Sequence, residues 1–402
     1  MRHVYLDHAA TTPLDPRVLE AMLPYLGHAC GNPSSFHSVG KEAKDAIEGA
    51  RARIAAVLHV RAEEIVFTSG GTESDNLAVL GYCRANAAGG KHMVVTAFEH
   101  HAVLEAVGHL EKHESFEVTR LLPDREGMIS VEQVMEAIRP DTIFVSVMYA
   151  NNEIGTVQPI GEIGNAIQKS KVKSQKLGKS YPIFHTDACQ ATGFLDLDVE
   201  KLHVDLMTIN GSKMYGPKGV GALYVRRGIK LQPLQFGGSQ ERGIRPGTEN
   251  VAGIVGMAKA LELVQADRSR ESARLVALRD KLVAGIRERV PKTRLNGHAT
   301  NRLPNNANVS FMDIEGEALV LYLDAAGVYV STGSACASSS LDPSHVILSL
   351  GLPFEVAHGS VRFSLGHATT AEDIDYVLDV LPPLVEKLRS ISPIRVDEKY
   401  FV

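Results

Sequence analysis

Short apolar segments rich in valine, isoleucine and phenylalanine alternate along this chain with longer segments of helical periodicity. Strands are predicted at 64–68, 92–96, 143–148, 183–186, 206–209 and 221–225. Strands that alternate with helices are typical of an α/β fold with a largely parallel sheet. In such a sheet ligands bind beyond the carboxyl ends of the strands. The unusual polar residues of this chain gather at those ends.

The second half of the chain has a different pattern. One helical segment extends from 251 to 290, where Pro291 ends it, and its charged middle suggests a bridge between two domains. Beyond it, strands are predicted at 308–311 and 359–365 and a helix at 371–389, which together form a smaller α+β unit. The basic, polar stretch 169–179 is expected to be a solvated helix end and loop.

Composition narrows the possible function classes. The 402 residues are 44% hydrophobic and 22% charged, as in a globular protein long enough for two domains. A net charge of -5 gives no general attraction to nucleic acid, although a local basic patch stays open. The four cysteines lack CxxC spacing, which argues against a disulfide framework and a self-contained zinc site. With no targeting segment or membrane span recognised, the cytoplasm is the expected location.

The segment 64–75 has the pattern of a strand, a glycine turn and a helix start. The turn lets backbone N–H groups at Gly71 approach an anion, and Thr72 adds a hydroxyl at the positive end of the helix, so a phosphate is the expected guest. The alternative is that Thr72 only caps the helix. Neither GxxxxGK[ST] nor GxGxxG occurs there, so a nucleotide motif is unsupported.

Two neighbouring strands end in chemically useful side chains. Asp187 ends one strand, with Gln190 a helical turn further on, and could hold a positively charged ring nitrogen or simply cap the next helix. Lys213 follows the next strand in a glycine-bounded turn. Lysines are usually solvated. A lysine beside an aspartate at this point of a sheet nevertheless has the arrangement for a Schiff base with an aldehyde and for later proton transfer.

Cys336 lies in the stretch 331–340, where its neighbours are small glycine, serine and alanine residues. Such a stretch has little apolar surface to bury and changes shape at low cost, so it suits a nucleophile that moves between two places. The thiolate would be the reactive form. The alternative is an ordinary surface loop.

Taken together, these residues show that the chain resembles the class I cysteine desulfurases of the NifS/IscS type, which are pyridoxal-phosphate enzymes of fold type I in the class-V aminotransferase family. The similarity extends from 5–13 to 362–366. It implies a mostly parallel seven-stranded sheet in a large domain, 15–260, and a smaller α+β domain formed by 1–14 and 261–402. The smaller domain would carry the catalytic cysteine loop, 331–341. The matching segments are 31–35, 69–74, 99–100, 151–155, Asp187 with Gln190, Lys213, 242–248 and 333–336.

The resemblance also implies a role for each site residue. Lys213 would form the Schiff base with pyridoxal 5′-phosphate, and Cys336 would be the nucleophile. Arg362 would bind the substrate carboxylate with help from Asn152, where the alternative is a surface ion pair. Asp187 would contact the pyridine nitrogen, and His100 would stack on the ring as a third catalytic residue. Gln190 and Asn152 would contact the phenolic oxygen. The phosphate would be held by Gly71, Thr72, Asn210, Ser212 and a second subunit's Thr248. A homodimer is therefore expected.

Some positions depart from the family pattern or have no clear role. Ser212 replaces a common phosphate-binding histidine, and His367 stands where an arginine often follows Ser-Leu-Gly. Contact with the phosphate should survive, whereas the charge that a histidine can carry is absent at Ser212. His101 is expected to be an ordinary polar residue at a helix start. We expect structural roles for the cysteines other than Cys336, least firmly for Cys30; the others are Cys83 and Cys189.

The implied reaction converts L-cysteine to L-alanine and leaves a persulfide on Cys336, from which sulfur passes to an acceptor protein. That acceptor could serve iron–sulfur cluster assembly or tRNA thiolation, and the sequence does not choose between them. No resident metal, nucleic acid or membrane partner is expected, and whether Cys336 ligates a cluster on a scaffold stays open. The alternatives are a selenocysteine lyase or an aminotransferase using the same lysine and aspartate, or a non-enzymatic sulfur carrier or scaffold partner.

Overall fold

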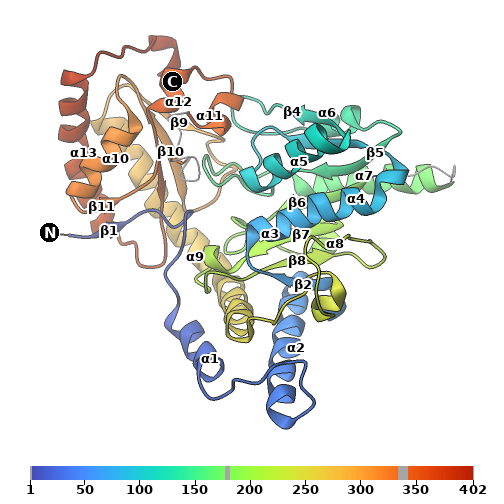
Figure 1. Ribbon diagram of the computed structural model, residues 1–402. Helices are drawn as coiled ribbons and strands as arrows, with labels where there is room; N and C mark the ends of the chain where they lie inside the picture. Colours follow the sequence, from blue (N-terminus) through green and yellow to red (C-terminus); the bar gives the residue numbers. More distant parts are fainter. Residues whose placement is uncertain (1, 177–181, 334–342, 402) are drawn as a thin grey trace.

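The computed structural model describes residues 2–176, 182–333 and 343–401 (Figure 1). Its largest element is a seven-stranded sheet with the order β2-β8-β7-β6-β5-β3-β4. Among these strands, β8 runs antiparallel to both of its neighbours, β2 and β7, and all other neighbouring strands pair in parallel. The strands are β2 (Ile65–Thr68), β3 (His92–Thr96), β4 (Glu117–Leu121), β5 (Thr142–Ser146), β6 (Ile183–Asp187), β7 (Leu206–Asn210) and β8 (Gly221–Val225).

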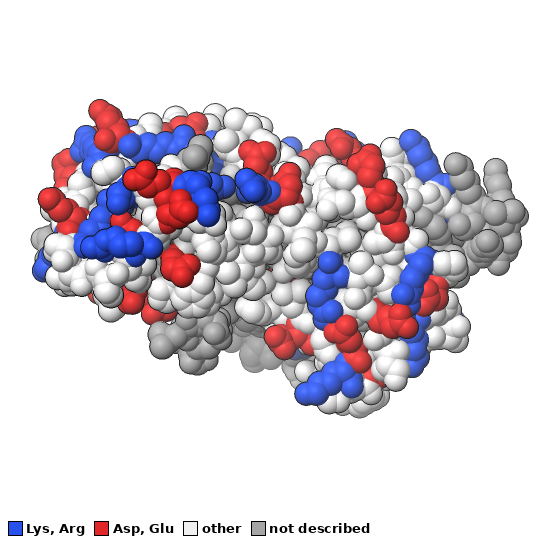
Figure 2. Space-filling view, turned by 90° about the horizontal axis from the view of Figure 1, so that it is seen from above, with Lys and Arg blue, Asp and Glu red and all other residues white. Residues whose placement is uncertain are grey.

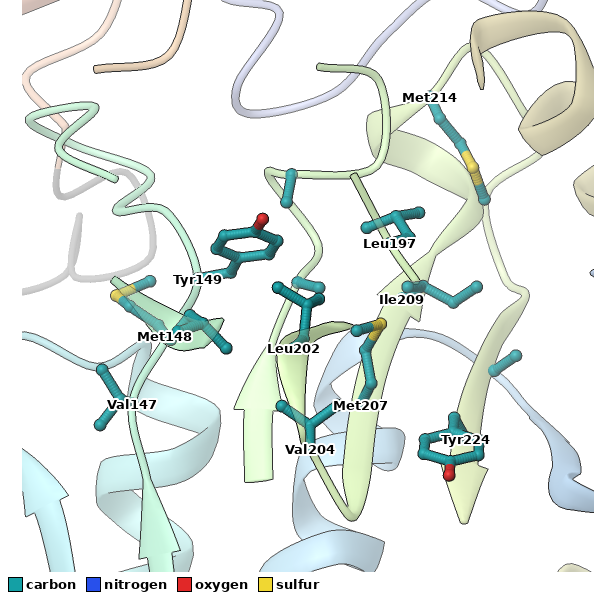
Figure 3. Packing of buried hydrophobic residues seen from close by; sticks show 14 of the residues in the cluster. Val147, Met148, Tyr149, Leu197, Leu202, Val204, Met207, Ile209, Met214 and Tyr224 are labelled. Atoms are coloured by element: carbon teal, nitrogen blue, oxygen red, sulfur yellow. The ribbon is translucent and has the colours of Figure 1, made fainter. Parts of the chain in front are cut away.

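Helices cover both faces of this sheet, so successive residues of one strand enter different hydrophobic clusters. Phe144 belongs to the cluster under α4 and α5, whereas Val145 belongs to the cluster formed with α1, α2, α7 and α9. Figure 3 shows the second cluster, where Met207 and Ile209 of β7 share one face. Burial on both faces explains the continuous apolar strand patterns. The helix bounds are α1 (Pro16–Leu26), α2 (Ser38–Leu58), α3 (Gly71–Asn76), α4 (Tyr82–Asn86), α5 (His101–Glu114), α6 (Val131–Ala137), α7 (Ile160–Lys176), α8 (Val199–Leu202) and α9 (Val251–Arg289).

A second unit has its own hydrophobic cluster around a three-stranded antiparallel sheet, with the order β12-β10-β9. Figure 1 shows α10 and α13 together on its outer side. The N-terminal strand β1 (Val4–Tyr5) joins this unit by pairing with β11 (Val328–Tyr329). The other elements are β9 (Thr293–Asn296), β10 (Asn306–Phe311), β12 (Ser360–Ser364), α10 (Gly316–Ala325), α11 (His345–Ser349), α12 (Phe354–His358) and α13 (Ala371–Ile391).

The long helix α9 connects the two units, because its residues enter two clusters. Ile254 and Leu261 pack in the cluster of the large sheet, and Leu275 and Leu282 pack in that of the small sheet. The helix predicted at 251–290 is therefore confirmed. The domain division at residue 260 stays a prediction, since α9 continues across it without a break.

The distribution of surface charge and the hydrophobicity of the helices bear on where the molecule can bind. Basic and acidic side chains are interspersed on the face shown in Figure 2, over both units. Among the described residues, no helix is both long enough and apolar enough to cross a lipid bilayer.

Candidate active site

A cavity of about 290 Å³ lies at the carboxyl ends of β6 and β7 and extends to β12 of the small unit. Parallel strands bring their carboxyl ends to one edge of a sheet, so residues distant in sequence meet there. The predicted site residues that line this cavity are Gly71, Thr72, His100, Asn152, Asp187, Gln190, Asn210, Lys213 and Arg362.

Lys213 ends a short 3-10 turn that follows β7 directly. Its Nζ atom donates hydrogen bonds to the carbonyl oxygens of Ala9, at 3.0 Å, and Ala10, at 2.5 Å. Gln190 donates to the same Ala9 carbonyl, at 3.0 Å. The turn requires Gly211, because a Cβ atom there would lie 2.7 Å from the Pro217 carbonyl oxygen. The Lys213 side chain is only partly exposed, and its amine is held at the cavity by the N-terminal segment.

Asp187 is the last residue of β6, with only 6% of its surface exposed. One carboxylate oxygen accepts a hydrogen bond from the Cys189 amide, at 2.8 Å, which fixes the orientation of the carboxylate. Asp187 thus stabilises the following turn, and it also lines the cavity. The capping interpretation holds only in part, because a turn and not a helix follows β6. A contact between Asp187 and a ring nitrogen stays a prediction.

Two further acids lie close to Asp187, and the sequence analysis assigned neither of them a role. Burial, and secondarily the charge of Asp187, raises the pKa of Glu99 to about 8. The same two causes raise the pKa of Asp75. Each has one carboxyl oxygen buried without a hydrogen-bond partner among the described residues. Protonation of Glu99 at neutral pH reduces the repulsion on the Asp187 carboxylate, and the raised pKa of Asp75 acts in the same direction.

His100 precedes α5, and its ring Nδ1 atom accepts a hydrogen bond from the Ala102 amide, at 3.1 Å. When the ring is neutral, its proton must therefore sit on Nε2. Burial lowers the pKa of His100, which favours this neutral form. His101 is the first residue of α5, as expected of a polar residue at a helix start, and packs against the His345 ring with a centroid distance of 4.6 Å.

A second cavity adjoins the first and offers hydrogen-bond donors and a positive charge that suit an anion. An adjoining cavity of about 350 Å³ is lined by Gly71, Thr72, Asn210 and Ser212, and also by Lys218, which the sequence analysis did not select. A Cβ atom at Gly71 would lie 3.0 Å from the Cys189 sulfur, so glycine leaves room there. Thr72 is not the cap of α3, since Gly70 holds that position without a side-chain bond. Backbone N–H groups, hydroxyls and an ammonium are suited to a phosphate.

Arg362 is on β12 and is only 2% exposed, so the surface ion-pair interpretation is wrong. Its guanidinium donates to the Asn152 carbonyl oxygen, at 3.0 Å, and to an Asp7 carboxylate oxygen, at 2.8 Å. Its Nε atom is buried and has no hydrogen-bond partner among the described residues. A buried donor of this kind lacks an acceptor that a substrate carboxylate could supply.

One predicted site residue is not brought to the cavities within one chain: Thr248 is exposed and lines neither of them. Cys336 lies outside the described residues, three positions after Gly333, which does line the main cavity. Of the other cysteines, Cys30 is exposed, while Cys83 and Cys189 are buried.

Four residues that line or contact the candidate site were not selected from the sequence: Asp7, Asp75, Glu99 and Lys218. Asp7 and Glu99 each had a signal, because they belong to segments 5–13 and 99–100 of the family pattern. Their roles could not be read from those segments, since each role depends on a partner far away in the sequence. Asp7 contacts Arg362 across 355 positions.

The family model described as aminotransferase class-V matches residues 4–377 of the chain. A relative from Dictyoglomus turgidum, named cysteine desulfurase IscS, is 52% identical over 399 residues, which cover 99% of this chain and 98% of the relative. A solved structure of a NifS-like protein is 36% identical, with a TM-score of 0.88 and coverage of 96% of this chain and 100% of that one. Another, "SspA in complex with cysteine", is 37% identical, with a TM-score of 0.78 and coverage of 90% and 98%. Each similarity spans both units of the fold.

Proposed function

The chain belongs to the class-V aminotransferase family and is a pyridoxal-phosphate-dependent cysteine desulfurase, and we propose that it converts L-cysteine to L-alanine while the sulfur passes first to Cys336. The observation that carries this proposal is the convergence of Lys213, Asp187 and Arg362 on one cavity. An amine, an anion and a guanidinium are thereby available to one small amino acid and its cofactor.

The residues present fit pyridoxal 5′-phosphate. Lys213 offers an amine to the aldehyde, and Asp187 offers a fixed carboxylate to the ring nitrogen. The room at Gly71 and the hydroxyls and amides of the adjoining cavity suit the phosphate. His100 would stack on the ring, with Gln190 and Asn152 beside its phenolic oxygen. When bound, the cofactor supplies an electron sink for the substrate's Cα atom.

We propose the following tasks for the side chains. Arg362 binds the substrate carboxylate through the donors of its guanidinium, among them the unpartnered Nε. The Nζ atom of Lys213 would remove the proton from the substrate's Cα atom. The carbonyl oxygens of Ala9 and Ala10 accept hydrogen bonds from this amine and hold it at the cavity.

The sulfur transfer itself is assigned to Cys336, which is outside the described residues. Its thiolate would attack the substrate sulfur and form an S–S bond. The C–S bond breaks, its electron pair returns to the carbon skeleton, and proton uptake there gives L-alanine. The protein retains a persulfide, and an acceptor protein would take this sulfur onward.

Replacing Cys336 by serine tests the proposal. We expect Cys336→Ser to keep the visible absorbance of the bound cofactor while alanine formation from L-cysteine falls to background. Cys30→Ser, which changes another cysteine and one that is exposed, is the matched control and should remain active. If Cys336→Ser still releases sulfide at the wild-type rate, the C–S bond is cleaved without this thiol, and the proposed role of Cys336 is contradicted. An aminotransferase would instead give no sulfide from L-cysteine even in the wild-type protein.

We further propose that the active form is a homodimer. Thr248 is exposed and lines neither cavity of its own chain, which suits a residue that completes the phosphate site of a second copy. Leu19, Leu23 and Leu26 form an exposed apolar row along α1, and Phe236 is 84% exposed. A second protomer would cover such surface. Sedimentation equilibrium should give twice the chain mass.

The acceptor and the location also belong to this proposal. The three described cysteines are free, which suits a reducing compartment, and we infer the cytoplasm. Sulfur would pass to an acceptor protein, for iron–sulfur assembly or tRNA thiolation. Co-purification, followed by transfer of label from ³⁵S-cysteine to the bound protein, would identify the acceptor. The absence of any labelled protein would contradict delivery to a protein.

A further inference from the structure

Tyr215 has a backbone conformation that tyrosine rarely adopts. Its φ angle is +60°, in the left-handed region, where a bulky side chain is strained. It lies two residues after Lys213 and is 9% exposed. Such a conformation persists only where its surroundings enforce it, and it is found most often at functional sites.

The surroundings enforce it through the backbone and through the side chain. The Tyr215 amide donates to the Thr12 hydroxyl, at 2.7 Å, and its carbonyl oxygen accepts from the Asp15 amide, at 3.0 Å. The phenolic oxygen accepts from the His367 amide, at 2.9 Å. The tyrosine and His367 rings are stacked, with centroids 3.7 Å apart and planes inclined by 10°.

His367 belongs to the chain that leaves β12, the strand of Arg362. Arg274 of α9 donates to the carbonyl oxygens of Gly366, at 2.9 Å, and His367, at 3.3 Å. Gly366 passes so close to the His8 ring that a Cβ atom there would lie 2.1 Å from it. This turn therefore has a fixed position, and it holds one end of the contact with Tyr215.

Tyr215 thus joins the turn that carries Lys213 to the strand that carries Arg362, across the contact between the two units. We propose that Tyr215 is a positioning residue that sets the separation between the Lys213 amine and the Arg362 guanidinium. The proposal rests on the proposed function, in which the substrate presents an amine and a carboxylate on one carbon atom. Because the amine and the carboxylate of the substrate are a fixed distance apart, the Lys213 amine and the Arg362 guanidinium must also be held at a fixed separation. His367 provides the flat ring for this contact.

The test uses two ligands that differ only in the carboxylate. L-Alanine carries both groups, whereas ethylamine lacks the carboxylate and so cannot use Arg362. Binding of each to the holoenzyme is followed by the visible absorbance of the cofactor. Tyr215→Phe removes the hydroxyl but keeps the ring. The matched control is Tyr224→Phe, because Tyr224 is also a buried tyrosine and lies on β8.

Loss of one hydrogen bond should weaken L-alanine binding to Tyr215→Phe by about three- to tenfold. Ethylamine binding should be unchanged, and Tyr224→Phe should behave as wild type with both ligands. Hydrogen exchange at the His367 amide should accelerate in Tyr215→Phe, because that amide loses its acceptor. This readout needs no activity.

The inference is overturned if both ligands weaken by the same factor, or if L-alanine binds to Tyr215→Phe as to wild type. Wild-type protein that binds neither ligand would instead overturn the proposed function, and this inference with it. The two failures are therefore distinguishable.

Discussion

The two ends of the proposed substrate site are built in different ways. Asp187 ends β6 and Lys213 follows the neighbouring parallel strand β7, so the register of one sheet places them together. Arg362 instead depends on Asp7 and Asn152, which are 355 and 210 positions away in the sequence. The first end is set by local order in the sheet and the second by packing between two units. Changes at the second end should therefore affect substrate affinity more than cofactor binding.

Replacement of Arg362 should separate the two ends most strongly. Arg362→Gln removes the charge that pairs with the substrate carboxylate, so L-alanine binding to the holoenzyme should weaken about 10- to 100-fold. Arg362→Lys should recover little, because an ammonium cannot reproduce the planar fork. Asp7→Asn, which leaves the guanidinium intact, should have a smaller effect. Cofactor absorbance and ethylamine binding are the controls. A parallel loss of cofactor from Arg362→Gln would contradict the separation.

The pH dependence of stability tests the aspartate end. Glu99 has a pKa of about 8 in the folded protein, above its usual value, so the folded state binds this proton more tightly than the unfolded state. The contribution of Glu99 to stability is thus complete in acid and is lost as pH rises toward 8. Relative to Glu99→Gln, which does not titrate, the wild-type free energy of unfolding should fall by at most about 1.4 kcal/mol per pH unit in this window.

Denaturant unfolding at several pH values between 5 and 8 measures this difference. Glu111 is the matched control, because its hydrogen bond with Arg120 lowers its pKa instead. The difference between wild type and Glu111→Gln should be constant over the same window. A constant difference for Glu99→Gln would show that this carboxyl is ionised throughout, and the description of the acids around Asp187 would be wrong.

The smallest effect is expected at the phosphate end. Ser212 contributes a neutral hydroxyl, so Ser212→Ala should speed cofactor release by about two- to fivefold. Lys218→Ala should do so more strongly at low than at high salt, because its contribution is a charge. Release is measured by loss of visible absorbance on dilution into an apoenzyme trap. An unchanged release rate in both variants would exclude this cavity as the phosphate site.

The sequence predicted the parts of the fold that are locally determined. Strands buried on both faces give continuous apolar runs, and all six of those predicted in the large sheet are present; 92–96 and 221–225 have the predicted ends, and the other four are shifted by one or two residues. β4 was missed because it is an edge strand with a mostly polar, partly exposed sequence. Strands β9 and β1 were missed for a related reason, since each is short and is defined by its pairing partner.

The same division applies to the site. The glycine turn, Asp187 and Lys213 could be selected from the sequence because each lies at or just beyond the carboxyl end of a predicted strand. Asp7, Asp75 and Lys218 could not, because their importance arises only from what the folded chain brings beside them. The buried state of Arg362 likewise depends on the contact between the two units.

The account as a whole depends on Lys213 being the amine that binds the cofactor. Borohydride reduction of the holoenzyme, followed by proteolysis and mass spectrometry of the labelled peptides, tests this directly. We predict one pyridoxyl label per chain, on Lys213. A label on another lysine, such as the neighbouring Lys218, or no label at all, would contradict the account.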